Sequence, residues 1–151
     1  MLDDIDRRIL RQWQAEPSLA PAELAERAGV SGAQLARRQA RMADAGLVSG
    51  VGAVIDWAAL GYAVEVSLRI TLDKGATQAF DAFLAAAREV PEVLEIQTFL
   101  GRVDVRLSIV ARDMVQYQQI YRDRILTLPH IADIEALMHV ARIKSEEALP
   151  L

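Results

Sequence analysis

Three arginines, Arg37, Arg38 and Arg41, lie close together in a segment that has helical character. A guanidinium group is always charged and carries several donors, and arginine commonly contacts DNA phosphates and guanine edges. In a helix, Arg37 and Arg41 lie one turn apart on one face, with Arg38 beside them. This spacing predicts contacts with a nucleic acid, and the simpler alternative is a solvated helix face.

A helix over residues 31–46 would position these arginines. Ser31 is a favourable N-cap, because its hydroxyl accepts from an unpaired N–H of the first turn, and Gly46 suits the left-handed residue after the last turn. Spacings of three and four predict an inward face of Leu35, Gln39, Met42 and Ala43. Gln39 is the exception on this face, because a buried amide needs hydrogen-bond partners.

Two shorter helices are expected before this one. The first begins at Asp3 or Asp4 and runs to about Gln14, and the second covers residues 22–28 and ends at Gly29. Two helices, a tight turn and a third helix form the pattern of a helix-turn-helix domain, whose third helix meets the bases of double-stranded DNA with its first turns. The predicted DNA contacts are therefore Ser31, Ala33, Gln34, Arg37, Arg38 and Arg41.

The charge distribution limits how strongly a single chain binds DNA. The chain has 151 residues and a formal net charge of −4, but residues 1–50 carry seven arginines and seven acidic residues and are neutral overall. DNA affinity depends on a local basic surface and not on the charge of the whole protein. The arginine helix provides a modest surface of this kind, so strong binding is expected only from a dimer or a larger assembly.

Composition and motifs argue against several other classes of site. There is no cysteine, which excludes disulfides and thiolate metal sites, and His130 and His139 lack metal-ligand spacing. No phosphate-loop or serine–histidine pattern is present, so neither an enzyme nor a cofactor is predicted. No segment approaches the roughly 18 apolar residues of a membrane span, and the first residues do not form a signal peptide, so a cytoplasmic location is expected.

The sequence pattern changes after Gly46. Residues 47–55 are small, β-branched and broken by glycine, which predicts a short hairpin or wing and then an extended linker strand, and residues 56–61 suggest a helical turn. In residues 64–72 apolar and polar residues alternate strictly, as in a strand with one buried face. The predicted domains are a helix-turn-helix domain at 1–50, a linker strand and turn at 51–61 and a second domain at 62–151.

The second domain has the order βαββαβ, which is typical of a ferredoxin-like fold with an antiparallel sheet. Its elements are expected at about residues 64–72, 77–89, 93–100, 103–109, 113–126 and 132–140. The fold class is therefore α+β, with an N-terminal winged helix-turn-helix domain. In this pattern the helices cover one face of the sheet, so the other face is either solvated or buried against a partner.

Six motifs follow one another in a fixed order along the chain. The N-terminal part has Leu2-Asp3-x-x-Asp6-x-x-Ile9-Leu10, Glu23-Leu24-Ala25-x-x-Ala28-Gly29-Val30-Ser31 and Arg38-x-x-x-Met42-x-x-x-Gly46-Leu47-Val48. The C-terminal part adds Gly101-x-x-Asp104, Asp113-x-x-x-Tyr117 and Ala148-Leu149-Pro150-Leu151. Each motif is weak alone, but in this order and spacing the sequence resembles the Lrp/AsnC family, also called feast/famine regulators, over nearly its whole length.

The resemblance implies a bacterial or archaeal transcription factor that binds double-stranded DNA and a small effector, often an amino acid. It also implies homodimers formed by pairing of the sheets, which commonly assemble into octamers. In the family, effectors bind between dimers near the turn that joins the second and third strands of the domain. Carried over by position, the predicted effector contacts are Leu100, Gly101, Arg102 and Asp104, with Ile134 and Ala136 on the last strand.

The effector turn departs from the family pattern. Arg102 and Val103 stand where an acidic and an aromatic residue are common, and the two last-strand positions lack the usual hydroxyl groups. These changes remove hydrogen-bond partners for an amino-acid head group, whereas Arg102 offers a partner for a carboxylate. Gly101 and Asp104 also have a plainer reading as turn residues, with Asp104 paired to Arg102 or Arg106.

Two alternatives to a DNA-binding regulator stay open at the level of sequence. A related two-domain architecture occurs in decarboxylases that act on a sirohaem-type tetrapyrrole, and these enzymes need groups poised over the macrocycle. The other alternative is a ligand-binding module that no longer binds DNA, which Gln39 and the neutral charge of residues 1–50 would suit. The main prediction is a transcriptional regulator whose assembly or operator binding responds to an amino acid or a related metabolite.

Overall fold

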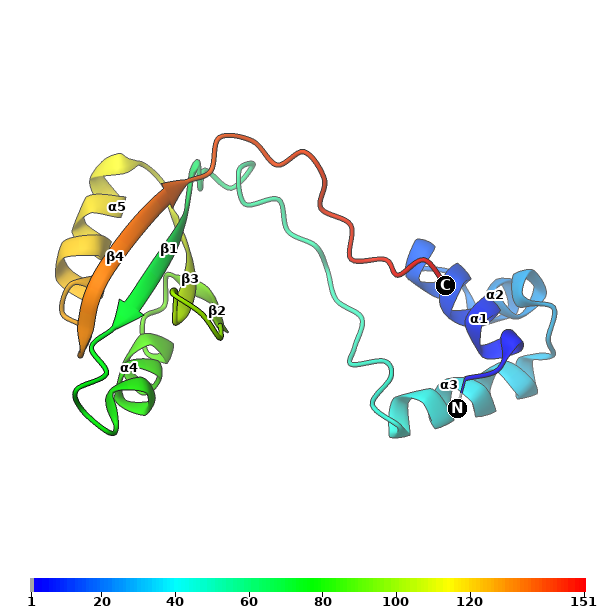
Figure 1. The fold of residues 1–151 in the computed structure, drawn as a ribbon. Coiled ribbons are helices and arrows are strands. Elements are labelled where there is room, and N and C mark those ends of the chain that lie inside the picture. The colour runs from blue at the N-terminus through cyan, green and yellow to red at the C-terminus, as the bar shows by residue number, and fades with distance from the viewer. Residues whose placement is uncertain (1) are drawn as a thin grey trace. The chain divides into compact units, whose positions relative to one another are not determined.

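The computed structural model describes residues 2–151, which form two compact units (Figure 1). One unit contains the residues up to Val54 together with Lys144–Leu151, and the other contains Ile55–Ile143. The chain therefore crosses between the units twice. The predicted boundaries assigned residues 144–151 to the sheet domain, whereas in the structure they group with the N-terminal unit because they bind its first helix.

Three helices form the N-terminal unit: α1 (Asp4–Ala15), α2 (Pro21–Ala28) and α3 (Gly32–Asp44). Asp3 and Ser31 each cap a helix in a capping box, and Gly29 ends α2 with a φ of 68°, a value that glycine adopts without strain. The helices meet in a small apolar core of Ile9, Leu24, Ala25, Ala28, Leu35 and Met42. This arrangement is the predicted helix-turn-helix.

Two predictions about α3 and the segment after it were wrong in detail. Ala43 is exposed, and Gln39 is only half-buried, so its amide does not require a protein partner. No strand lies between residues 47 and 63, so the wing and the linker strand do not form in the part of the chain that is described. A strand needs a pairing partner, and the backbone of residues 49–55 makes no hydrogen bond within residues 2–151.

The second unit contains four strands and two α-helices in the order βαββαβ. These are β1 (Val64–Leu72), α4 (Ala79–Arg88), β2 (Val93–Thr98), β3 (Val105–Ala111), α5 (Met114–Ile120) and β4 (Ile131–Met138). A single π-helical turn over Tyr121–Ile125 continues α5. All strand pairs are antiparallel, in the sheet order β2-β3-β1-β4, which confirms the predicted α+β fold.

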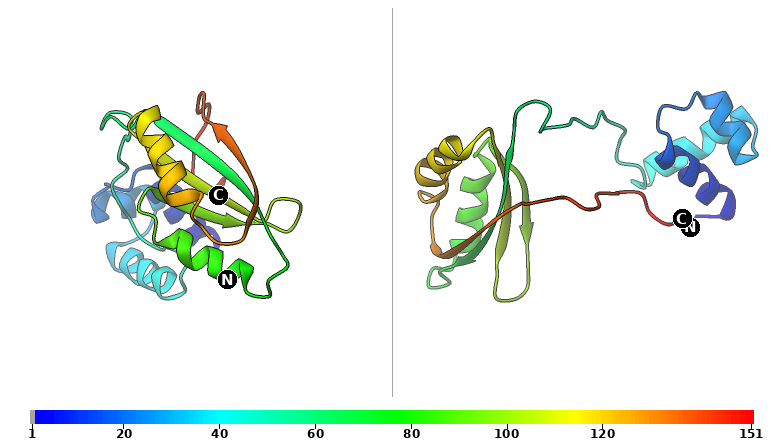
Figure 2. Two further views of the ribbon diagram at one scale, coloured as in Figure 1. Left: turned by 90° about the vertical axis from the view of Figure 1, so that its left-hand side faces the viewer. Right: turned by 90° about the horizontal axis from the view of Figure 1, so that it is seen from above.

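The two helices of this unit cover the same face of the sheet (Figures 1 and 2). Alternate side chains of β1, such as Leu68 and Ile70, are fully buried against Phe83 of α4 and Ile120 of α5. Burying one side chain of this size contributes about 1.5–3 kcal/mol relative to leaving it exposed. The strict alternation in the sequence therefore identified the core face correctly.

The opposite face of the sheet carries charged side chains in cross-strand pairs. Arg69 Nη1 of β1 lies 3.8 Å from Glu135 Oε2 of β4, and Arg106 Nη2 of β3 lies 3.3 Å from Glu95 Oε2 of β2. Such exposed pairs contribute little to stability by themselves. No helix of the second unit covers this face within the described residues, so it is accessible to a partner.

Two further features were sought in residues 2–151. No helix there is both long enough and apolar enough to cross a membrane. No three His, Asp or Glu side chains in the same range are arranged to hold a metal ion.

Candidate DNA-binding surface and effector turn

The start of α3 is fixed by two side chains that bind each other's backbone. Ser31 Oγ accepts from the N–H of Gln34 at 3.2 Å, and Gln34 Oε1 accepts from the N–H of Ser31 at 3.1 Å. Both side chains are exposed, as is Ala33 between them. The Ser31 hydroxyl and the Gln34 Nε2 amide can still donate outward, so these three positions suit contacts with bases.

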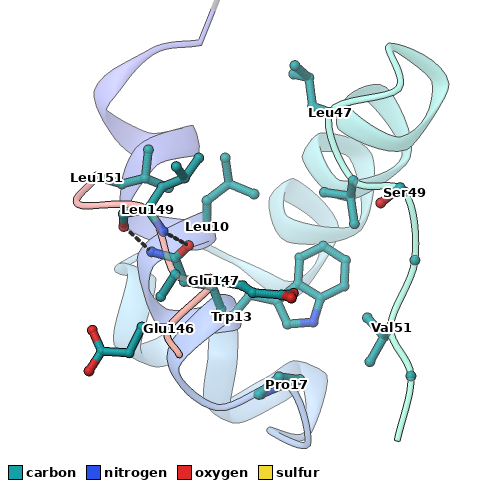
Figure 3. A pocket seen from close by; sticks show the side chains of 15 residues that line it. Leu10, Trp13, Pro17, Leu47, Ser49, Val51, Glu146, Glu147, Leu149 and Leu151 are labelled. Carbon is teal, nitrogen blue, oxygen red and sulfur yellow. Dashed lines mark hydrogen bonds between the residues drawn. The ribbon is translucent and has the colours of Figure 1, made fainter. Parts of the chain in front are cut away.

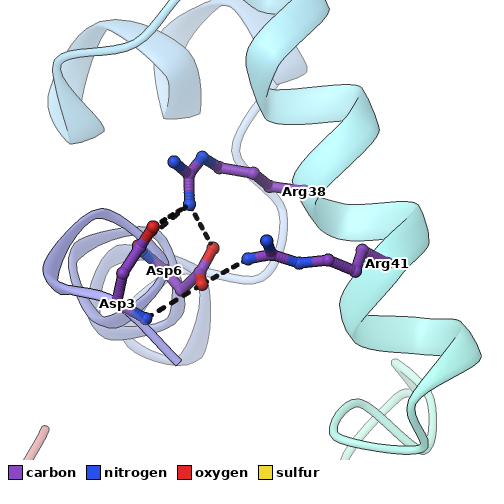
Figure 4. A network of polar contacts seen from close by, with 4 residues as sticks. All are labelled: Asp3, Asp6, Arg38 and Arg41. Carbon is purple, nitrogen blue, oxygen red and sulfur yellow. Dashed lines mark hydrogen bonds and ion pairs between the residues drawn. The ribbon is translucent and has the colours of Figure 1, made fainter. Parts of the chain in front are cut away.

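Arg38 is bound to acidic side chains of α1 and its cap (Figure 4). Its Nη1 donates to both carboxylate oxygens of Asp3, at 2.9 and 2.7 Å, and to Asp6 Oδ1 at 2.7 Å. Only 15% of the Arg38 side chain is exposed. Its hydrogen bonds to Asp3 and then to Asp6 raise the pKa of the Arg38 guanidinium above its ordinary value. The guanidinium is therefore engaged within the protein.

Asp6 is the centre of this network, and its side chain is fully buried. Its carboxylate accepts from Arg38, from Arg41 Nη2 and, at 3.1 Å, from the N–H of Asp3. Burial raises the pKa of Asp6 and is the largest influence on it, but these three donors outweigh burial and hold the pKa below its ordinary value. The buried carboxylate is thus charged and ties α1 to α3.

The remaining two arginines of α3 differ from Arg38 in exposure. Arg41 gives one nitrogen to Asp6, but 56% of its side chain is exposed. Arg37 is exposed and makes no hydrogen bond or ion pair with any described residue. The three arginines of the sequence motif therefore divide into one that is engaged inside the unit, one that is shared and one that is free to bind a phosphate or a guanine.

The sequence did not identify Asp6 as a partner of Arg38. A signal was present, because Asp6 lies three residues before Ile9 and so shares the inward face of α1. A carboxylate on a buried face requires a cationic or hydrogen-bonding partner. Which arginines bind the Asp6 carboxylate depends on how α1 crosses α3, and the sequence does not show that crossing.

Asp104 has a comparable role at the proposed effector turn. Its Oδ2 accepts from the N–H of Leu72 at 2.8 Å, and its Oδ1 lies 3.0 Å from Lys74 Nζ. The Leu72 hydrogen bond, followed by Lys74, lowers the pKa of Asp104 despite the opposing effect of burial. The predicted pairing with Arg102 or Arg106 was wrong, since Lys74 is the cation that contacts this carboxylate. Lys74 was not predicted as a partner, because it lies in a different loop of the chain.

The other turn residues point outward. Leu100, Gly101 and Arg102 are exposed, and the Gly101 φ of 156° is one that side-chain-bearing residues rarely adopt. The turn is held to β1 by two further bonds: Thr71 Oγ1 donates to the Arg102 carbonyl at 3.1 Å, and the N–H of Asp104 donates to the Ile70 carbonyl at 3.0 Å. The Arg102 guanidinium makes no bond within residues 2–151 and is free to meet a ligand.

The predicted positions on β4 lie at the same end of the sheet as this turn. Ile134 is paired with Ile70 of β1, and Ile70 is also paired with Val105, the residue after Asp104. Ile134 is half-buried against the core, whereas Ala136 is exposed and lies two residues farther along the strand. The turn and Ile134 therefore lie at the same end of the sheet with β1 between them, and Ala136 lies farther from that end.

Family sequence models match both units of the chain. The model of the AsnC-type helix-turn-helix domain matches residues 2–43, and the model of the Lrp/AsnC ligand binding domain matches residues 65–149. Together these matches cover most of the sequence. The candidate DNA and effector contacts described above lie within the matched ranges.

Individual relatives have similar lengths. The chain is 32% identical over 132 residues to the proline dehydrogenase transcriptional activator of Rhodobacter capsulatus, which covers 87% of this chain and 86% of that protein. It is 29% identical over 148 residues to the leucine-responsive regulatory protein of Salmonella typhimurium, which covers 98% of this chain and 90% of that protein.

Solved structures of similar proteins have the same fold. A transcriptional regulator from Neisseria meningitidis, solved as a complex with L-Met, superposes with a TM-score of 0.91 at 27% identity, covering 99% of this chain and 97% of that chain. An AsnC family transcriptional regulator from Agrobacterium tumefaciens gives a TM-score of 0.89 at 30% identity, with the same coverage of both chains.

Proposed function

Because the chain belongs to the Lrp/AsnC family of DNA-binding, effector-responsive transcriptional regulators, we propose that it binds its operator through the exposed side of α3. The observation that supports this most directly is that the arginines of α3 differ in their contacts within the protein. Arg38 is engaged by Asp3 and Asp6, while Arg37 is exposed and uncommitted. The Arg37 guanidinium has no partner within residues 2–151 and is therefore available to bind DNA.

Each predicted DNA contact then has its own role. Ser31, Ala33 and Gln34 approach the base edges at the start of α3, where recognition helices meet the major groove. Arg37 contacts a phosphate or a guanine, and Arg41 contributes with the part of its guanidinium that Asp6 leaves free. Arg38 is a positioning residue, because it fixes the angle of α3 through α1 and does not itself reach outward.

The effector site is proposed at the turn over residues 100–104 and the part of β4 at the same end of the sheet. Asp104 is already bound by Leu72 and Lys74, so it shapes the turn and leaves ligand binding to other groups. Arg102 supplies a cation for a carboxylate, and Ile134 supplies apolar contact. An amino acid carries both kinds of group, and a relative has been solved with L-Met. An amino acid or a related carboxylate metabolite is therefore the proposed effector.

A homodimer that assembles further, to an octamer, is the proposed functional form. The uncovered sheet face offers complementary charges of both signs on neighbouring strands, which suits pairing with a second copy of itself. Pairing two chains also doubles the modest basic surface of α3. We propose that the assembly acts in the cytoplasm, because its target is DNA.

Selection of bound duplexes from a random pool, with and without a panel of amino acids, tests this function. The selected site is then used to compare Arg37→Ala with Arg88→Ala, which removes an exposed helical arginine of the other unit. We expect Arg37→Ala to weaken operator binding by about 1–3 kcal/mol and Arg88→Ala to leave it unchanged. Equal affinities for the two variants would remove Arg37 from the interface.

A further inference from the structure

The segment 144–151, called here the tail segment, is bound to α1 by an unusual reciprocal contact (Figure 3). Gln14 Nε2 donates to the Leu149 carbonyl at 2.6 Å, and the N–H of Leu149 donates back to Gln14 Oε1 at 3.0 Å. One turn earlier on the same helix, Arg11 Nε donates to the Leu151 carbonyl at 2.7 Å. One amide side chain thus pairs with both backbone groups of one residue, as a neighbouring β-strand would.

The tail segment lies beside a groove of the N-terminal unit. With the tail segment in place the groove has a volume of about 550 Å³, and its walls are formed by α1, by residues 47–52 and by the tail segment itself. Leu149 and Leu151 contribute to the lining from the tail segment. Main-chain hydrogen bonds along an extended peptide, together with apolar side chains beside a groove, form a known mode of peptide recognition.

The tail segment can leave this position without disrupting either core. The apolar core of the N-terminal unit contains no residue after Val48, and the core of the sheet unit contains none after Ile134. The contacts that hold the tail segment are partly exposed hydrogen bonds, which are individually weak. Docking is therefore separable from folding.

We propose that this groove is a peptide-binding site whose ligand is the chain's own tail segment, and that the docked tail segment is a second tether between the two units. The first connection is the covalent passage at residues 54–55. The second runs from β4 through residues 139–143 into the docked segment. A ligand joined to its site by a short linker has an effective concentration in the millimolar range, so even a weak site is occupied.

The tether gives the effector a route to the DNA-binding unit. This part rests on the proposed function, because it uses the effector site beside Ile134. β4 carries that residue and leads directly into the tail segment. Effector binding that shifts β4 alters the position of the tail segment on α1. Because α1 is bound to α3 through Asp6, this also affects α3.

The test uses Trp13 as a reporter, because Trp13 lines the groove and Trp57 is the only other tryptophan. In a Trp57→Phe background, chain 1–143 should give a red-shifted Trp13 emission that acrylamide quenches more strongly than in the full chain. The synthetic peptide Lys-Ser-Glu-Glu-Ala-Leu-Pro-Leu should reverse this with a Kd of about 0.1–1 mM, and a scrambled peptide should not. Unchanged Trp13 emission, or no peptide binding, overturns the proposed site.

Gln14→Ala in the full chain separates docking from the loss of residues. It removes both hydrogen bonds to Leu149 and should raise acrylamide quenching of Trp13 toward the value of chain 1–143. Gln12→Ala is the matched control, because it makes the same change on the same helix at a residue that makes no side-chain hydrogen bond within residues 2–151. Equal quenching for the two variants contradicts the role assigned to Gln14.

The tether itself is tested by the time-resolved fluorescence anisotropy of Trp13. In the full chain the N-terminal unit should tumble with the rest of the molecule, and in chain 1–143 it should gain a faster component. The free peptide takes the position of the tail segment on α1 but cannot connect the units, so it should leave this faster component unchanged. Identical decays, or restoration by the peptide, overturn the tether. None of these signals requires DNA, so a failure of operator binding would count against the proposed function alone.

Discussion

Asp6 and Asp104 are the two buried carboxylates of the chain's described part, one in each unit, and they are satisfied in different ways. Asp6 is held by two arginines from α3 and therefore joins separate helices. Asp104 is held by a backbone N–H of β1 and by one lysine, so it fixes the path of a turn. The first arrangement uses the charges of the DNA-binding helix, whereas the second leaves the cation of its own turn, Arg102, free.

This difference shows how function divides between the units. In the N-terminal unit, the structural bonds use two arginines of the motif proposed to bind DNA, and Arg37 is left without a partner in residues 2–151. In the sheet unit, the structural bonds use backbone groups and a residue outside the turn. Removing Asp6 should therefore break a contact between two helices, whereas removing Asp104 should loosen only one turn.

Removing Asp6 should have the largest effect. Asp6→Ala leaves Arg38 with only the exposed Asp3 as a partner and breaks the link between α1 and α3. We expect the free energy of unfolding of the N-terminal unit to fall by about 3–5 kcal/mol, the usual cost of removing one partner of a buried ion pair. Urea unfolding followed by Trp13 emission measures this loss. The exposed Asp4→Ala on the same helix should change stability by less than about 0.5 kcal/mol, and equal losses for both would refute the network.

Asp104→Ala should have a smaller effect, confined to the sheet unit. The Leu72 N–H loses its acceptor inside the protein, which costs about 1–3 kcal/mol. Amide hydrogen exchange should become faster at Leu72 while α1 and α3 stay protected. Asp133→Ala, at an exposed position of β4, is the control. Slow exchange at Leu72 in the Asp104 variant would show that this hydrogen bond does not hold the turn.

The ion pair of Asp3 with Arg38 also predicts how the stability of the N-terminal unit depends on pH. The Asp6 N–H and then Arg38 lower the pKa of Asp3 from 3.8 to about 2. A carboxyl group with a lowered pKa in the folded state stabilises that state above its ordinary pKa, and the contribution disappears as the pH falls from about 4 to about 2. Asp3→Asn should flatten the fall in stability of the N-terminal unit over this range. An unchanged pH profile would argue against the ion pair of Asp3 with Arg38.

Much of the fold was predictable because its signals are local. Ser31 and Gly29 marked helix ends, and the alternation over Val64–Leu72 identified both the strand and its buried face. The π-helical turn after α5 was not anticipated, because the apolar spacing there reads as a continuous α-helix. The absent wing had local signals, but a strand also requires a partner that sequence cannot supply.

The site was predictable only in part, because its decisive contacts join distant residues. The arginine motif and the glycine turn were visible in sequence, whereas the bonds from Arg38 to Asp6, from Lys74 to Asp104 and from Gln14 to Leu149 depend on how elements pack. The sequence therefore indicated which residues could bind a ligand or DNA. The packing of the elements determines which of these side chains have no partner within the protein.

The most direct test of the account is the salt dependence of operator binding by Arg37→Ala and Arg38→Ala. If Arg37 meets a phosphate, its loss should reduce the slope of log K against log salt by about one and leave unfolding unchanged. Arg38→Ala should destabilise the N-terminal unit, while its folded fraction keeps the slope of the unmodified chain. The account is contradicted if Arg38→Ala reduces the slope and Arg37→Ala does not.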